Sequence, residues 1–334
     1  MKKIACVGYH YTGSGAVDDL FRECDNVYQG KYEAEFRLLH DPDGISDLEY
    51  FLVENPNRLS SSLAIKRFLR YTNQSYRMTR HIIGKEWFSI VDKFVDNIIQ
   101  IEHSGYNNGD KYFFTTFQKT VDFLCRGVNK ILPKPLKMPK DSLLVPYTKT
   151  YYSKLTEEEF LNKVNIFIEE LCQCINKEGK EYVVLDQFVS SSNPSRCLRY
   201  ANDLKVIIVD RDPRDLYINR ISKRDRILPS NPMDFAKYYR KIREFVGDVD
   251  DTNVLRINLE DMIYNYDDSI RRIFDFVKMD SSHHVTPKKY FNPDVSITGT
   301  QTWKSHPEYA EAVKIIEQEL PDFLYPYNNK IESC

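Results

Sequence analysis

A glycine-rich segment near the amino terminus has the composition of a phosphate-binding loop. It runs from Gly8 to Ala16 and holds three of the 12 glycines in the chain. The apolar residues 4–7 before it predict a buried strand, and apolar residues at helical spacing after it predict a helix. A loop in that position offers backbone N–H groups and a positive helix end to an anion. The candidate anion-binding residues are Tyr11, Thr12, Gly13, Ser14, Gly15 and Ala16. An ordinary tight turn is the alternative.

The same loop departs from the pattern of nucleotide-hydrolysing proteins. Gly8 and Gly13 have the spacing of the first two glycines in G-x-x-x-x-G-K-[ST]. Ser14, however, stands at the lysine position, and Gly15 stands at the position of the hydroxyl that binds magnesium. The loop therefore predicts phosphate binding without magnesium and argues against hydrolysis of ATP or GTP.

A second charged cluster follows residues 205–209, the clearest apolar run in the chain. Arg211 comes just after this predicted strand, where ligands bind in open α/β sheets. Pro213 suits the first turn of a helix, and Asn219 lies two turns beyond Arg211. Arg211 and Asn219 can both reach one phosphate, with the guanidinium as a charge-assisted donor. The alternative is a charged helix start in which Arg211 and Arg214 pair with nearby aspartates.

Short apolar runs separated by helical segments predict the elements that position these residues. The runs lie at 4–7, 182–186, 205–210 and 253–257. Such a pattern is typical of a parallel sheet with helices on both faces. Thr156 and Glu159 predict the start of a long helix through a capping box. We predict one α/β domain over residues 1–330, with a mostly helical insertion at about 58–150.

Composition restricts the partners and the compartment. The chain has 47 Lys plus Arg against 49 Asp plus Glu, so it lacks the basic excess of nucleic-acid-binding proteins. Its seven cysteines form no CxxC pair, which predicts reduced thiols. The first apolar stretch is too short for a secretory signal, and no window reaches the length of a membrane span. These features predict a soluble, cytoplasmic protein with no nucleic-acid partner and no membrane span.

Together the two motifs resemble those of the sulfotransferases that use 3′-phosphoadenosine 5′-phosphosulfate (PAPS), and the bacterial type in particular. That family has a strand–loop–helix for the 5′-phosphosulfate. It also has a strand ending in Arg-[Asn/Asp]-Pro-[Arg/Lys]-Asp, with a serine eight positions after the arginine, for the 3′-phosphate. This chain has the motif from Arg211 to Asp215, with Asn219 at the serine position. The resemblance implies a P-loop-like α/β fold, PAPS as the donor, 3′,5′-ADP as the product and no required metal.

A segment near the carboxyl terminus adds to this resemblance. Gly299 is followed by Trp303 and Lys304 and then by a predicted helix. The family often carries a glycine-containing loop followed by Trp-Lys and a final helix, which implies that Trp303 and Lys304 bind the nucleotide. The family's Arg-Lys pair at the start of that loop is absent here. Trp303 in the core and Lys304 on the surface is the alternative.

The resemblance also implies a glutamate or a histidine as the base for the acceptor proton. Residues 32–41 follow the first strand–helix unit, where the glutamate-using relatives place theirs. Glu35 is the first candidate in this segment, Glu33 the second and His40 the third. Asp186, at the end of a predicted strand, is a further candidate because it faces the ligand edge of the sheet. A charged face without a catalytic residue is the alternative.

The lysine that the family places in its phosphosulfate loop has no counterpart between Gly8 and Leu20. The candidates to replace its charge are the backbone N–H groups, His10, Lys304 and Lys66. The sequence does not choose among them.

These features predict transfer of a sulfuryl group from PAPS to a hydroxyl or amine acceptor. A carbohydrate is the expected acceptor, as a surface glycan or its precursor, and the aromatic residues of the insertion are candidates to stack on sugar rings. One alternative is a P-loop nucleotide kinase-like phosphotransferase, which would require magnesium. Another is a nucleotide-binding protein that lacks catalysis.

Overall fold

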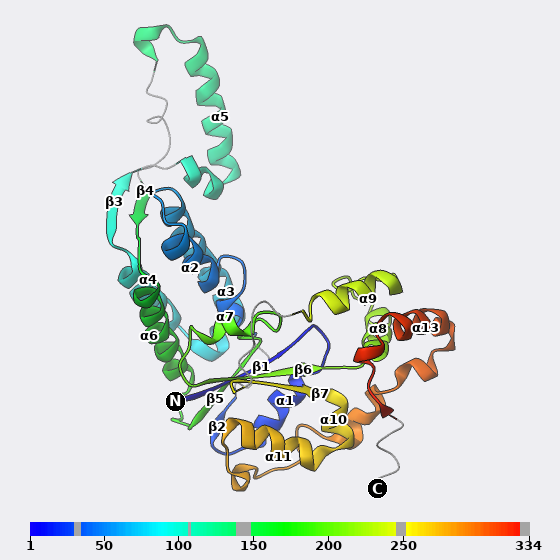
Figure 1. Ribbon diagram of the computed structural model, residues 1–334. Coiled ribbons are helices and arrows are strands. Elements are labelled where there is room, and N and C mark those ends of the chain that lie inside the picture. The colour runs from blue at the N-terminus through cyan, green and yellow to red at the C-terminus, as the bar shows by residue number, and fades with distance from the viewer. Residues whose placement is uncertain (30–34, 106–107, 138–147, 245–251, 328–334) are drawn as a thin grey trace. The chain divides into compact units, whose positions relative to one another are not determined.

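The computed structural model describes residues 1–29, 35–105, 108–137, 148–244 and 252–327 (Figure 1). The chain divides into two compact units. The first unit is Met1–His40, Thr79–Gly84 and Ile168–Cys334, and the second is Asp41–Met78 and Lys85–Phe167. The second unit extends beyond the predicted insertion at both ends. The assignment of residues 1–330 to a single domain stays a prediction.

A parallel sheet is the centre of the first unit. Its strands are β1 (Lys2–Gly8), β2 (Val27–Tyr28), β5 (Tyr182–Asp186), β6 (Leu204–Asp210) and β7 (Val254–Asn258). They lie in the order β2-β5-β1-β6-β7, and every pairing is parallel. The predicted α/β class, a parallel sheet flanked by helices, is confirmed. All four predicted apolar runs form strands of this sheet.

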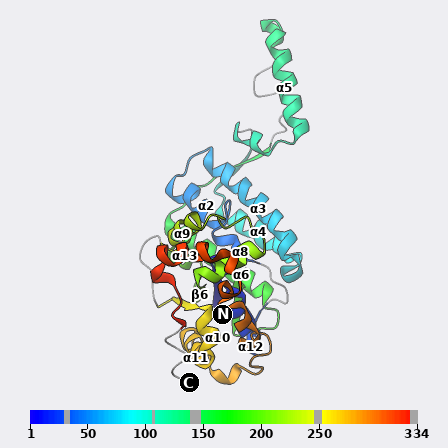
Figure 2. The same ribbon diagram turned by 90° about the vertical axis from the view of Figure 1, so that its right-hand side faces the viewer.

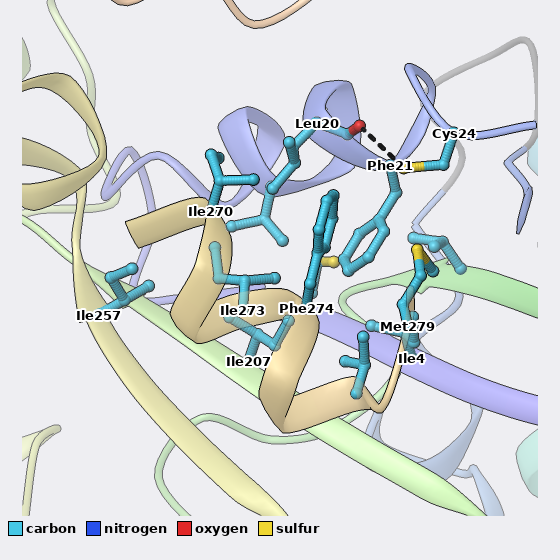
Figure 3. Packing of buried hydrophobic residues seen from close by; sticks show 14 of the residues in the cluster. Ile4, Leu20, Phe21, Cys24, Ile207, Ile257, Ile270, Ile273, Phe274 and Met279 are labelled. Carbon is cyan, nitrogen blue, oxygen red and sulfur yellow. Dashed lines mark hydrogen bonds between the residues drawn. The ribbon is translucent and has the colours of Figure 1, made fainter. Parts of the chain in front are cut away.

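The sheet is buried on both faces, as a parallel sheet must be. Ile4, Ala5, Cys6 and Val7 alternate between the two faces of β1, yet each is at most 1% exposed. On one face, side chains of the strands pack against α1 (Ser14–Phe21), α10 (Leu259–Tyr264) and α11 (Tyr266–Val277). Figure 3 shows this cluster, with Phe21 and Phe274 between the helices and the strands.

A second cluster of buried residues in the first unit is built by α8 (Pro213–Ser222), α9 (Pro232–Lys241) and α13 (Ala310–Glu319). The first unit also contains α7 (Pro194–Leu198) and α12 (Pro293–Ser296). Helix α13 packs against α8 and α9 (Figure 2), where Leu216, Phe235 and Ile316 are buried. This cluster fixes α8, the helix that follows β6 and carries the second motif.

The second unit is mainly helical. It contains α2 (Ile45–Glu49), a π-helical turn (Tyr50–Glu54), α4 (Glu86–Ile98), β3 (Ile101–Gly105), α5 (Thr116–Ile131) and β4 (Thr148–Tyr152). It also holds most of α3 (Ser60–Ile83) and the first part of α6 (Glu157–Ile175). The rings of Phe68, Phe94 and Phe167 form its core, and those of Phe94 and Phe167 stack at 4.4 Å. The predicted capping box of Thr156 and Glu159 is confirmed by both hydrogen bonds.

The structure bears on three further expectations from the sequence, which concern the cysteines, membrane-spanning helices and the aromatic residues of the second unit. None of the six described cysteines is part of a disulfide bond. No helix within the described ranges is both long enough and apolar enough to cross a membrane. Of the aromatic residues in the second unit, Trp87 is in the core, where its indole N–H donates to the Thr72 carbonyl at 3.0 Å. Tyr112, in contrast, is 64% exposed.

Candidate active site

A cavity of about 1080 Å³ lies in the first unit at the carboxyl ends of β1, β5 and β6. Its lining includes ten residues that the sequence singled out: Tyr11, Thr12, Gly13, Ser14, Gly15, Glu35, His40, Asp186, Arg211 and Asn219. Three others, Ala16, Trp303 and Lys304, are not among the lining residues. The fold thus brings together segments about 200 residues apart in the sequence.

The loop after β1 has an unusual backbone. His10, Tyr11 and Gly13 have φ angles of 71°, 56° and 100°, all in the left-handed region. The buried Thr12 hydroxyl accepts a hydrogen bond from the Tyr9 N–H at 3.0 Å. Gly8 is required beside it, because a Cβ there would lie 2.3 Å from the Thr12 hydroxyl oxygen. The turn delivers the chain into α1 with Gly13 as an N-cap that lacks a side-chain cap. The first N–H groups of a helix have no partner inside it and are suited to an anion.

Gly15 differs from Gly8 and Gly13. A Cβ at Gly13 would lie 2.8 Å from the Leu259 side chain, so packing requires glycine there. A Cβ at Gly15 would meet no protein atom within 4 Å, and Gly15 lines the cavity. The packing of the protein therefore does not explain this glycine. A ligand that approaches the backbone closely does explain it.

Arg211 joins two loops at the cavity wall. Its Nη1 donates to the Tyr11 carbonyl at 3.3 Å and its Nη2 to the Gly299 carbonyl at 2.6 Å. The side chain is 9% exposed, and its Nε has no hydrogen-bond partner in the described structure. None of the ion pairs found in the described ranges joins this guanidinium to a carboxylate. A buried charged group with an unused donor is costly unless a ligand completes it.

Arg214, three residues later, has a different environment. Its guanidinium donates twice to the Asp212 carboxylate, at 3.0 and 2.7 Å, and once to Glu317 at 2.9 Å. It also lies 4.0 Å above the Trp303 ring. The pairing with aspartate that was the alternative for both arginines therefore holds for Arg214 alone. The structure places Trp303 beneath Arg214, and Lys304 donates to the Gln301 side chain.

Asp215 explains how the motif holds Arg211 in place. It is fully buried and accepts hydrogen bonds from the N–H groups of Gln301 and Thr302 at 2.9 and 2.7 Å. Burial raises the pKa of Asp215, against the hydrogen bonds from Thr302. Asp215 thus anchors the loop whose Gly299 carbonyl orients Arg211. Asp215 is part of the sequence motif, but the motif does not indicate that Asp215 binds the loop containing Gln301 and Thr302.

Asp186 lies beside the glycine-rich loop that follows β1. The Gln187 side-chain amide donates to the Asp186 carboxylate at 3.2 Å and to the Ser14 hydroxyl at 2.9 Å. The Asp186 carbonyl accepts the Phe36 N–H at 2.8 Å. One amide group therefore connects the end of β5 to the first turn of α1.

Asp18 forms a carboxyl pair with Asp186. It lies on α1, is 8% exposed and lines the same cavity, and its Oδ1 has no hydrogen-bond partner in the described structure. Burial, followed by the charge of Asp186, raises the pKa of Asp18 well above its ordinary value. A raised pKa favours the protonated form of Asp18. The sequence analysis did not identify Asp18, although an acid on the buried face of α1 was a signal for it.

The other candidate bases are less enclosed or already donate. The Glu35 side chain is 46% exposed and lies 3.4 Å from the Arg37 guanidinium. His40 Nε2 lies 2.9 Å from the Gln187 carbonyl oxygen. Because a carbonyl only accepts, Nε2 carries a hydrogen, and only Nδ1 of His40 is left to accept a proton. Glu33 lies outside the described residues.

Lys223 is a cation in the cavity lining that the sequence analysis missed. It follows the last turn of α8, and its Nζ lies 4.3 Å from the centre of the Tyr11 ring. It stands four residues after Asn219, a spacing that places two side chains on one helix face. Of the replacements considered for the loop lysine, His10 pairs with Asp225 at 3.0 Å, and Lys66 pairs with Asp110 in the second unit.

Comparisons with known proteins give matches among solved structures. No protein-family model matches the chain, and the search of curated proteins found no match. The sulfotransferase domain of the curacin biosynthetic pathway is 11% identical, with 95% of this chain and 96% of that chain covered and a TM-score of 0.44. The sulfotransferase domain of the Synechococcus olefin synthase is 12% identical, with 90% and 87% covered and a TM-score of 0.43. Retinol dehydratase, solved with androsterone and the inactive cofactor PAP, is 13% identical, with 98% and 84% covered and a TM-score of 0.36.

TM-scores this low carry no argument about function, so the chemistry of the cavity is argued from its own residues.

Proposed function

We propose that this chain transfers a sulfuryl group from PAPS to a hydroxyl or amine acceptor. The supporting observation is that Arg211, with its buried and unpartnered Nε, lines the same cavity as the uncapped start of α1. The two features are suited to two anionic groups of one molecule. PAPS has such groups at its 3′ and 5′ positions.

The residues present fit each end of this donor. The N–H groups at Ser14 and Gly15 would hold the 5′-phosphosulfate, where the open space at Gly15 allows close approach. Arg211 and Asn219 would hold the 3′-phosphate, and Lys223 would supply the positive charge that the loop lacks. When bound, PAPS supplies the sulfuryl group and a phosphate as its leaving group.

Asp186 is our choice for the base. Its carboxylate would take the proton that the acceptor loses, and Asp18, which lines the same cavity, has a raised pKa because it is buried near Asp186. The Gln187 amide holds Asp186 against the phosphate loop and so positions the base beside the reacting group. Positioning and electrostatics of this kind supply most of the rate in the related phosphoryl transfers. Glu35 is the second choice because it lines the same cavity.

A carbohydrate remains the proposed acceptor class, as a surface glycan or its precursor. Support comes from the polar part of the cavity lining, which includes Gln29, Gln187, Ser190, Ser191 and Ser192. Amide and hydroxyl side chains match the paired donors and acceptors of sugar hydroxyl groups. We further propose that the reaction takes place in the cytoplasm and needs no metal ion.

Thermal unfolding with two nucleotides tests the proposal. We expect 3′,5′-ADP to raise the melting temperature, because a ligand at 100 times its Kd stabilises the native state by roughly 2.7 kcal/mol. ATP with magnesium is expected to give a much smaller shift. Stabilisation by ATP with magnesium alone would favour a phosphotransferase and contradict the proposal. If 3′,5′-ADP binds but labelled PAPS sulfates no acceptor in a broad panel, the chain is a nucleotide-binding protein without catalysis.

A further inference from the structure

Helix α5 belongs to the second unit and is labelled in Figure 1. It is amphipathic, but none of its residues is buried. Five of its apolar residues recur at a spacing of four and three, with the exposed Phe123 outside this pattern: Phe117, Val121, Leu124, Val128 and Ile131. At 3.6 residues per turn these five positions fall within about 80° of the helix circumference. Phe117 is 77% exposed and Ile131 is 87% exposed. The helix therefore presents an apolar face that no described residue covers.

The charge around this face is strongly positive. Residues 111–137 contain six Lys or Arg, and Asp122 is their one acidic residue, so the segment carries a net charge of +5. The whole chain has a net charge of −2, so this charge is concentrated locally. Lys119 and Arg126 lie on the side of α5 opposite to the apolar face. This is the charge pattern of a helix that lies on a membrane surface.

Exposed aromatic and aliphatic groups continue the apolar surface beyond the ends of α5. Tyr112 precedes the helix and is 64% exposed, and Leu136 follows it and is 62% exposed. Aromatic rings at such positions are typical of the membrane interface. Lys134 and Lys137 flank Leu136 in the sequence, so the basic character extends to the same end.

A second copy of this chain is a weaker candidate for the partner. The apolar spacing is that of a coiled-coil seam, but the positions beside the seam are Gln118, Thr120, Cys125 and Gly127. None of them supplies the complementary charges that normally select a coiled-coil partner. Two copies of a segment with a charge of +5 would also repel each other. An anionic surface fits both the apolar face and the charge.

We propose that α5 docks this protein on an anionic lipid surface. The apolar face would enter the boundary between headgroups and acyl chains, and the basic side chains would contact lipid phosphates. An acceptor carried by a membrane lipid would then be within the protein's reach, although the docking itself does not depend on the proposed sulfuryl transfer.

Co-sedimentation of the full chain with vesicles tests the docking. We expect binding to phosphatidylcholine vesicles with about 30% phosphatidylserine, and binding at least about tenfold weaker to phosphatidylcholine alone or in about 0.5 M NaCl. Leu124→Glu should weaken binding about tenfold more than Asn129→Glu, because the first places its charge on the apolar face. The two variants have the same net charge, so Asn129→Glu is a matched control.

Two further measurements complete the test. Equal melting temperatures of the two variants would show that lost binding does not come from unfolding. A Phe117→Trp variant should show a blue-shifted emission when the anionic vesicles are added. Equal vesicle binding by Leu124→Glu and Asn129→Glu would overturn the proposal, and so would a wild type that stays in the supernatant. Dimerisation that Leu124→Glu abolishes, without vesicle binding, would assign the face to a second copy.

Discussion

Helices α1 and α5 have the same kind of amphipathic sequence and opposite surroundings. In α1, Leu20 and Phe21 are fully buried against the sheet and α11 (Figure 3). In α5, Leu124 is 58% exposed and no residue is buried. The spacing of apolar residues therefore predicts a helix and its apolar face, but it does not predict what covers that face.

The charged side chains of the two regions also differ in how firmly their surroundings hold them. Around the cavity, Arg211 donates hydrogen bonds to two neighbouring loops, and the Asp186 carboxylate accepts one from the Gln187 amide. On α5, Arg126 has a neighbour on its own helix, Asp122. An exposed pair of this kind is worth little. We therefore expect the same substitution to have a large effect in the first region and a small one in the second.

The largest expected difference concerns two aspartates. Asp186→Asn should lower turnover by about 10²–10⁴-fold, because it removes the proposed general base and leaves the shape unchanged. Asp122→Asn, the same change on α5, should leave turnover within about twofold. Sulfate transfer from labelled PAPS to a soluble acceptor measures both, with 3′,5′-ADP affinity as the check that the cavity is intact. Full activity of Asp186→Asn would move the assignment to Glu35.

A second pair of variants compares the packing of the two helices. Leu20→Ala should lower the free energy of unfolding by about 2–5 kcal/mol, because it leaves a cavity beneath α1. Leu124→Ala should change it by about 0.5 kcal/mol or less, since its side chain is exposed. Chemical denaturation monitored by circular dichroism measures both values. A comparable loss in Leu124→Ala would mean that α5 is covered in solution by another part of this chain or by a second copy.

The sheet could be predicted from the sequence because its strands are apolar on both faces. The strands β1, β5, β6 and β7 stand out as short apolar runs, and a glycine-rich turn or an arginine marks where two of them end. The antiparallel pair of β3 and β4 was missed, since β3 is largely exposed and has no apolar run.

Parts of the candidate site could not be read from local patterns. Glycine spacing and the Arg-Asp-Pro-Arg-Asp motif indicated two anion-binding segments, and both line one cavity. Asp18 and Lys223 lie outside those motifs, and their importance depends on which side chains the fold places opposite them. The different environments of Arg211 and Arg214 depend on Asp212, Glu317 and the loop after Ile297. Such contacts join residues up to about 100 positions apart, and a local pattern does not specify them.

We propose that Arg211 holds the 3′-phosphate of the donor, and binding affinities measured by calorimetry test this role directly. The affinities of 3′,5′-ADP and 5′-AMP are measured for the wild type, for Arg211→Ala and for Arg126→Ala as the matched control on α5. We predict that the 3′-phosphate contributes about 1.5–3 kcal/mol to binding in the wild type and in Arg126→Ala, and close to nothing in Arg211→Ala. An equal contribution of the 3′-phosphate in all three proteins would show that Arg211 does not hold this phosphate.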